Sequence, residues 1–150
     1  MLTVGVIGYG YWGPNLVRNF VANDDAQVAM VADTQPRRLE QVKKRYPAIK
    51  TTTSARDIFR ADDIDAVAIA TPVVTHYDLA LAALQAGKHV LVEKPMASSS
   101  EQAQRLIEEA EKRNLVLMVD HTFVYTGAVR KIADLINRGE LGDIYYYDST

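Results

Sequence analysis

Short apolar runs alternate along the chain with longer stretches whose apolar residues recur at helical spacing. The runs predict buried strands over residues 2–7, 28–32, 66–70, 89–93 and 115–119. Strands and helices in alternation require a parallel sheet that is covered by helices on both faces. The pattern therefore predicts a doubly wound α/β fold.

Three of the helices are predicted to start where a serine or threonine is followed three residues later by an acidic residue. In such a capping box the hydroxyl accepts a hydrogen bond from the first turn, and the carboxylate bonds back to the chain. The pairs are Ser54 with Asp57, Thr75 with Asp78, and Ser98 with Glu101. Gly87 follows the second of these helices, where a left-handed residue is expected.

The end of the chain has a different pattern. Apolar residues within 128–136 suggest a helix, Gly139 and Gly142 a turn, and Ile144–Tyr147 a strand. A natural domain seldom ends on an exposed tyrosine-rich edge, because unpaired edges invite association. We therefore expect one domain over residues 1–121. Residues 122–150 are expected to form a connecting helix and the first strand of a truncated second α/β domain.

The six residues that directly follow the first predicted strand have the spacing G-x-G-x-x-G. They are Gly8, Tyr9, Gly10, Tyr11, Trp12 and Gly13. The motif directly follows a buried strand and opens a helix, which is the setting of a dinucleotide-binding Rossmann fold. The helix N-terminus would offer free N–H groups and a positive dipole end to a pyrophosphate. A glycine-rich turn without a ligand is the alternative. The three aromatic residues could flank the cofactor, or equally pack against a missing domain.

Asp33 lies 20 residues beyond Gly13 and ends the second predicted strand. A carboxylate there accepts hydrogen bonds from an adenosine ribose and repels a 2′-phosphate, which favours NAD over NADP. A simple helix-entry role is the alternative. Arg37 and Arg38 could stack on the adenine or neutralise a 2′-phosphate, so that NADP stays possible. We place Asp33, Thr34 and Arg38 in the predicted cofactor site.

Composition narrows the function further. Apolar residues make up 48% and charged residues 24%, as in globular proteins, and the net charge of −2 argues against a dedicated nucleic-acid or membrane binder. The absence of cysteine excludes disulfides, cysteine-ligated zinc and a thiol nucleophile, and it fits a reducing cytoplasm. No signal peptide or transmembrane stretch is expected. The histidines lack metal-ligand spacing, so no metal is expected either.

Polar residues gather where three predicted strands end, and ligands bind at the carboxyl ends of strands in such sheets. Thr71, Pro72 and His76 follow strand 66–70; Glu93 and Lys94 follow one another at the end of strand 89–93; Asp120 and His121 follow strand 115–119. A charged surface turn is the alternative role for Lys94.

Three stretches resemble, in this order, the Gfo/Idh/MocA family of NAD(P)-dependent oxidoreductases. They are GYGYWG, TPVVTHYDLALAALQAGKHVLVEKP and VDHTFVYTGAVRKIADLINRGELGDIYYYDS, and the Glu-Lys-Pro element is the most specific part. The resemblance implies that Lys94 is a catalytic acid/base or orienting residue and that His121 faces the nicotinamide or substrate. It also implies that Glu93 lies near the nicotinamide ribose, and that Thr71, Pro72 and His76 border the cofactor. Pro95 is expected to hold the turn, with a cis Lys-Pro bond.

The same resemblance sets the expected function. It implies hydride transfer between a nicotinamide cofactor and a secondary alcohol of a sugar, polyol or nucleotide sugar, and the closing stretch is similar to nucleotide-sugar 3-dehydrogenases. The family's second catalytic element and its larger second domain, which often forms a dimer interface, are expected beyond Thr150. The piece alone is then expected to be inactive. At the position of Asp120, members of the family commonly have glycine or asparagine, so this sequence places an extra carboxylate there.

Two alternatives belong to other classes of function. A stand-alone NAD-binding module could sense redox state or scaffold a partner without catalysis. A Rossmann-like methyltransferase would share the glycine-rich turn, but nothing in that class accounts for Glu93, Lys94 and Pro95.

Overall fold

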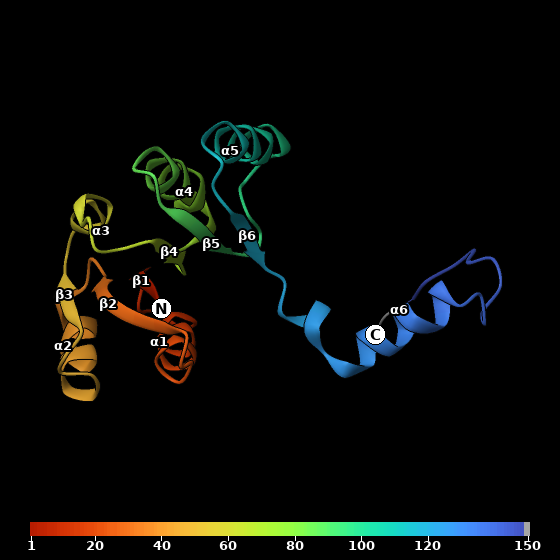
Figure 1. The fold of residues 1–150 in the computed structure, drawn as a ribbon, viewed down its shortest axis with the longest axis horizontal. Helices are drawn as coiled ribbons and strands as arrows, with labels where there is room; N and C mark the ends of the chain where they lie inside the picture. Colours follow the sequence, from red (N-terminus) through yellow and green to blue (C-terminus); the bar gives the residue numbers. More distant parts are fainter. Residues whose placement is uncertain (149–150) are drawn as a thin grey trace. The chain divides into compact units, whose positions relative to one another are not determined.

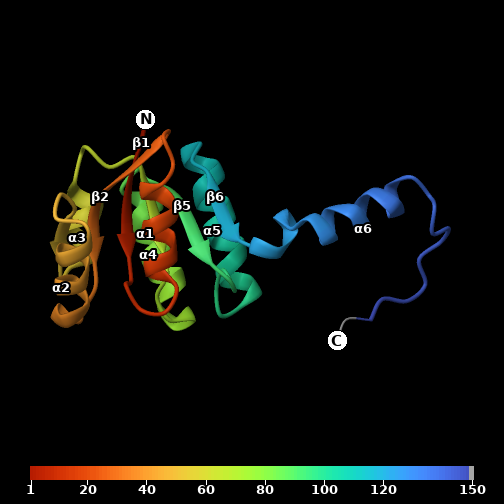
Figure 2. The same cartoon turned by 90° about the horizontal axis from the view of Figure 1, so that it is seen from below.

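A computed structural model describes residues 1–148 of the chain, which forms two compact units, Met1–Asp120 and His121–Thr150. The first unit contains a sheet of six parallel strands in the order β3-β2-β1-β4-β5-β6 (Figures 1 and 2). The strands are β1 (Leu2–Ile7), β2 (Ala26–Ala32), β3 (Lys50–Thr52), β4 (Ala66–Ile69), β5 (His89–Glu93) and β6 (Leu117–Asp120). The chain runs outward from β1 to β3, returns to β4 and then runs the other way. This is the doubly wound order of the Rossmann fold, as predicted.

Helices cover both faces of this sheet. They are α1 (Gly13–Val21), α2 (Pro36–Arg45), α3 (Ala55–Arg60), α4 (His76–Gln85) and α5 (Ser100–Arg113), with the 3₁₀ turn η1 (Val73–Thr75) before α4. One buried cluster joins the sheet to α1 and α2, and the other joins it to α3, α4 and α5 (Figure 1). Burial on both faces explains why the strands appear in the sequence as continuous apolar runs.

The strand predictions differ from the structure mainly at the ends. β1 and β5 have the predicted bounds, whereas β2 starts two residues earlier, β4 ends one residue earlier, and β6 spans Leu117–Asp120 instead of 115–119. β3 has no counterpart among the predicted strands, because Lys50–Thr52 contains no apolar run. This short edge strand forms by pairing with Met30–Ala32 of β2.

The predicted capping boxes are wrong in their hydrogen bonds. α3 and α4 start directly after Ser54 and Thr75, but neither hydroxyl caps its helix. Thr75 instead donates its hydroxyl proton to the Pro72 carbonyl. α5 starts one residue later than predicted, and its cap is Ser99, whose Oγ accepts from the backbone N–H of Gln102. The left-handed residue is confirmed at Gly87, where φ is +77°.

The second unit contains the 3₁₀ turn η2 (Thr122–Tyr125) and the helix α6 (Gly127–Asn137). Positive φ angles at Gly139 and Gly142 fit the predicted turn. The predicted strand over Ile144–Tyr147 is wrong: these residues have no regular structure. A strand needs a neighbour to pair with, and none pairs with this segment within residues 1–148. Among the described helices, none is both long and apolar enough to cross a membrane.

Candidate functional site

The glycine motif forms the loop between β1 and α1. Gly8 has a φ of +94°, and a Cβ there would come within 2.6 Å of the Ala70 carbonyl oxygen. A Cβ on Gly13 would overlap the Gly8 carbonyl oxygen. Both positions therefore require glycine for the backbone to fold back so tightly. A Cβ added at Gly10 would lie 3.6 Å from its nearest neighbour, Arg38 Nη1, which is an ordinary van der Waals contact. This side of the loop therefore leaves room for a ligand.

The start of α1 beside this loop has no competing anion. Its N-cap residue is Trp12, no side chain caps the helix, and its first turn contains no acidic residue. Pro14 occupies the first turn, where a missing N–H costs nothing. A helix N-terminus without its own acceptor, next to a loop with an open side, fits the pyrophosphate of a dinucleotide.

Asp33 ties the end of β2 to the glycine loop. Its Oδ2 accepts a hydrogen bond from the Tyr9 backbone N–H at 2.7 Å, and its Oδ1 accepts from Gln35 N–H at 2.8 Å. Arg38 Nη1 lies 3.2 Å from Oδ2 and is far more exposed than the carboxylate. Thr34, next in the chain, is exposed. Asp33 is thus an organiser of the loop as well as a candidate ribose ligand, and Arg38 lies between it and Gly10.

The three aromatic residues of the motif differ in exposure: Tyr9 is buried, Trp12 is half-buried and Tyr11 is exposed. Tyr9 is 4% exposed and packs into the core cluster of α1 and α2, so only its backbone contributes to the loop. Burial raises the pKa of its hydroxyl. Tyr11 is exposed and stacks on Trp12, with ring centroids 6.2 Å apart. The ring of Tyr9 thus packs in the core of the first unit, in neither of the two positions predicted for it, while its backbone stays part of the predicted cofactor loop.

His76 joins the ends of β4 and β5. Its ring is buried, with Nε2 2.7 Å from the Thr71 carbonyl oxygen and Nδ1 2.8 Å from the Pro95 carbonyl oxygen. A carbonyl oxygen only accepts, so the hydrogen bond runs from whichever ring nitrogen carries a proton. The Lys94–Pro95 peptide is cis, as expected. His76 is placed to hold the two loops together, while Thr71 and Pro72 lie at the strand end itself.

Glu93 and Asp120 are partners in the register of β5 and β6. Glu93 Oε1 is buried and has no hydrogen-bond partner in the described part of the chain. Burial is the main reason why the pKa of Glu93 rises to about 7, and hydrogen bonding with Asp120 and its negative charge raise it further. The backbone N–H and the charge of Lys94 act in the opposite direction. Such a carboxyl group can bind and release a proton near neutral pH.

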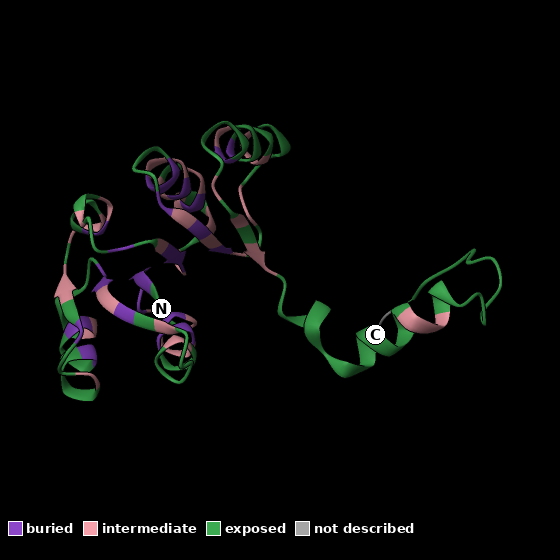
Figure 3. Cartoon of the chain, viewed as in Figure 1, coloured by how far each residue is buried: buried purple, intermediate pink, exposed green. Residues whose placement is uncertain are grey.

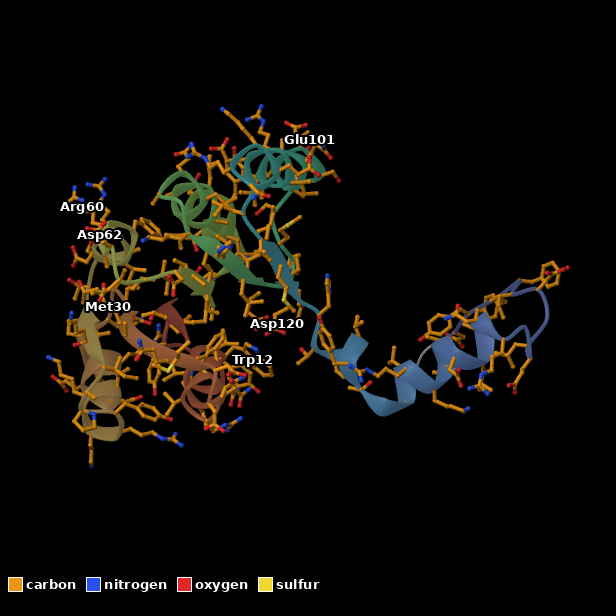
Figure 4. The ribbon with its side chains drawn as sticks, in the orientation of Figure 1. Trp12, Met30, Arg60, Asp62, Glu101 and Asp120 are labelled. Carbon is orange, nitrogen blue, oxygen red and sulfur yellow. The ribbon has the colours of Figure 1, made fainter. Side chains whose placement is uncertain are left out.

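The strand register brings most of the predicted residues to one edge of the sheet. Ile7 of β1 pairs with Ile69 of β4, which pairs with Val92 of β5, so the residues that follow them are level. Trp12 Nε1 donates a hydrogen bond to Asp120 Oδ2 at 3.4 Å, and Figure 4 labels both residues at this edge. Lys94 is exposed there. His121 is the first residue of the second unit and is also exposed.

Two long-range contacts leave no local pattern in the sequence from which they could be predicted. The hydrogen bond from Trp12 to Asp120 joins residues 108 positions apart. Lys88 is buried and donates to the carbonyl oxygens of Ala61 and Ile64, which holds the chain before β4. The only available signal for Lys88 was its place between Gly87 and a strand. Within residues 1–148 no group of three or more His, Asp or Glu side chains is arranged to hold a metal ion.

The family model and the curated relatives that this chain matches are all oxidoreductases. The profile of the Gfo/Idh/MocA oxidoreductase family, described as an NAD-binding Rossmann fold, matches residues 2–121. The scyllo-inositol 2-dehydrogenase (NADP(+)) of Bacillus subtilis is 31% identical, over 97% of this chain and 40% of that protein. The myo-inositol 2-dehydrogenase of Thermotoga maritima is 27% identical, over 94% of this chain and 42% of that protein.

Solved structures give the same result. The scyllo-inositol dehydrogenase of Lactobacillus casei superposes with a TM-score of 0.90 at 26% identity, over 96% of this chain and 44% of that one. A 3-ketoreductase of Actinomadura kijaniata in complex with NADP and TDP-benzene gives 0.85 at 31% identity, over 92% of this chain and 42% of that one. The chain thus spans about two fifths of the length of these relatives.

Proposed function

This chain belongs to the Gfo/Idh/MocA family of oxidoreductases, and on that premise we propose that it is the NAD(P)-binding domain of a sugar or polyol dehydrogenase. The reaction is hydride transfer between a nicotinamide cofactor and a secondary alcohol of a sugar, polyol or nucleotide sugar. The observation that carries this proposal is the β1–α1 loop, which requires glycine at two positions and leaves room at Gly10. The inositol dehydrogenases among the relatives support the substrate class.

The residues present fit such a cofactor. The backbone of residues 8–13 and the uncapped start of α1 would bind the pyrophosphate, with Asp33 on the adenosine side. When bound, the cofactor supplies or accepts the hydride. Lys94, exposed at the end of β5, would exchange a proton with the substrate hydroxyl at Nζ. His76 would keep that strand end in place through Pro95.

NAD is proposed as the preferred cofactor and NADP as a second one. Asp33 supports NAD because its carboxylate would accept hydrogen bonds from the ribose diol once Arg38 moves aside. Arg38 supports NADP, because its guanidinium already lies next to Gly10 and would pair with a 2′-phosphate. The NADP named for two of the relatives agrees with this second role.

The remainder of the enzyme is proposed to lie beyond this chain. Since the relatives are more than twice as long, we propose that residues 122–150 begin a second α/β domain, which completes the substrate site and forms a homo-oligomer interface. The 150-residue chain alone is then proposed to bind the cofactor without turning over substrate. The cytoplasm, which holds soluble nicotinamide cofactors, is the proposed location.

Calorimetric titration of the 150-residue chain with NADH and with NADPH tests the cofactor assignment. We expect both to bind, NADH more tightly, and Arg38→Ala to weaken NADPH binding more than NADH binding. Lys43→Ala, on the exposed side of α2, is the matched control for loss of one positive charge. A folded chain that binds neither nucleotide would contradict the cofactor site. Tighter binding of NADPH would contradict only the proposed preference.

A further inference from the structure

Two carboxyl groups stand side by side where β5 and β6 end. Glu93 and Asp120 are register partners on adjacent parallel strands, so their side chains leave the sheet on the same side. Oxygen Oε1 of Glu93 is buried without a partner among the described residues. Asp120 Oδ2 accepts from the Trp12 indole N–H, which anchors this carboxyl group to the glycine loop (Figure 4). The pair is therefore physically connected to the proposed cofactor site.

Charge repulsion prevents both groups from ionising freely. Two carboxylates that share a site favour a state with one proton between them. The structure provides one opposing positive charge, Lys94, but its effect on the pKa of Glu93 is smaller than that of burial and of Asp120. The result is a Glu93 pKa of about 7, so at neutral pH the pair is partly protonated. Asp120 acts on this proton as the neighbouring negative charge and hydrogen-bond partner of Glu93.

The topology shows which half of a dinucleotide would reach this pair. A bound pyrophosphate would lie at the point where the strand order reverses, between β1 and β4. Asp33 at the end of β2 would mark the adenosine side, so that the other nucleoside would face the ends of β4, β5 and β6. That nucleoside carries a nicotinamide ring, which is positively charged when oxidised and neutral when reduced. This step rests on the proposed function.

We propose that the Glu93–Asp120 pair holds one proton in the free chain and releases it to solvent when the oxidised, cationic nicotinamide binds. An added positive charge beside a buried, unpartnered carboxyl oxygen favours the ionised form. The reduced cofactor brings no such charge and leaves the proton in place. The pair thereby makes the affinity for oxidised cofactor fall as the pH drops below neutral, by up to about tenfold per pH unit for one linked proton.

Calorimetry in two buffers with different ionisation enthalpies measures this proton directly. At pH 7 we expect NAD⁺ binding to release a measurable fraction of a proton from the 150-residue chain, and NADH binding to release none. Asp120→Asn should reduce the release, because losing the neighbouring charge and hydrogen bond lowers the Glu93 pKa, although burial still raises it. Asp62→Asn removes the same charge from an exposed position near α3 and should keep the release (Figure 4).

Carbon-13 NMR of the glutamate side-chain carboxyl groups gives a second readout that needs no nucleotide. One glutamate should titrate near neutral pH in the wild-type chain and shift to lower pH in Asp120→Asn. Equal proton release with NAD⁺ and NADH, or unchanged release in Asp120→Asn, would overturn the inference and leave the proposed function standing. Failure of the folded chain to bind any nicotinamide nucleotide would overturn both.

Discussion

Both units of the chain contain large apolar side chains, but only the first unit buries them. In residues 1–120 the large aliphatic side chains form two buried clusters, one on each face of the sheet. In the C-terminal segment, residues 121–148, no residue is buried, although its helix α6 has an apolar side and Phe123 and Tyr145 are large aromatics (Figure 3). An amphipathic pattern thus predicts where a helix forms, whereas the stability of that helix depends largely on a second surface against which it packs.

This difference shows which apolar side chains of the chain are left uncovered. Exposed apolar side chains in the C-terminal segment include Phe123, Tyr125, Ile132, Ile136, Ile144 and Tyr145. Concentrated apolar exposure marks a surface that associates with another one. The proposed second domain would supply that surface, whereas the first unit has its own core. Four predictions test this comparison, from the largest expected effect to the smallest.

Gly13→Ala and Gly127→Ala should give the largest difference in the free energy of unfolding between the two units. The new Cβ at Gly13 would overlap a backbone atom, the Gly8 carbonyl oxygen, so we expect a loss of about 3–5 kcal/mol in the free energy of unfolding, with loss of NADH binding. At Gly127, in the first turn of α6, no atom lies within 4 Å, and alanine should be neutral or stabilise by up to about 1 kcal/mol. Urea denaturation measures both. Equal losses would contradict the comparison.

Leu106→Ala and Ile132→Ala compare the apolar sides of two helices. Leu106 on α5 is fully buried, so its truncation should cost about 2–5 kcal/mol. Ile132 on α6 is substantially exposed in this chain, so the same measurement should give a change within about 0.5 kcal/mol. In a longer protein with the proposed second domain, the cost at Ile132 should rise. A large loss at Ile132 in the 150-residue chain would show that the C-terminal segment is already covered.

The same contrast explains how much could be predicted from the sequence. The ends of β1 and β5, the glycine loop and the position of Asp33 follow from local patterns, because apolar runs and glycine spacing act on neighbouring residues. Tyr9 shows the limit: a tyrosine between two loop glycines gives no sign that its ring enters the core. The pairing of Glu93 with Asp120 depends on strand register, which arises only in the folded sheet.

His76→Gln and His121→Gln compare two histidines of the predicted site. His76 is buried with its two ring nitrogens at the carbonyl oxygens of Thr71 and Pro95, and one flexible terminal amide would replace these two separate ring positions, so we expect a loss of about 1–3 kcal/mol. His121 is exposed, and its change should stay within about 0.5 kcal/mol. Thermal unfolding with and without NADH measures both variants. An equal loss at the two positions would argue against the connection that His76 makes between Thr71 and Pro95.

Asp120→Asn and Asp134→Asn each remove one carboxylate, the first from residues 1–120 and the second from the C-terminal segment. They should change the free energy of unfolding in opposite directions. Asp134 pairs with Lys131 and Arg138 on the exposed surface of α6, so its loss should destabilise by no more than about 0.5 kcal/mol. Asp120 repels Glu93, and removing that charge should stabilise the chain by about 1 kcal/mol at pH 8, after allowance for solvent screening.

The pH dependence of that gain is the sharpest part of the comparison. The pKa of Glu93 is raised from 4.5 to about 7 in the folded chain, so between these values the folded state binds more protons than the unfolded state. Stability therefore falls as the pH rises through this window, and the penalty is complete above it. Asp120→Asn should accordingly stabilise at pH 8 and give no gain at pH 4.5, where Glu93 is largely protonated. Urea denaturation at both values measures this. A gain that is independent of pH would mean that Asp120 acts through packing and not through the charge of Glu93.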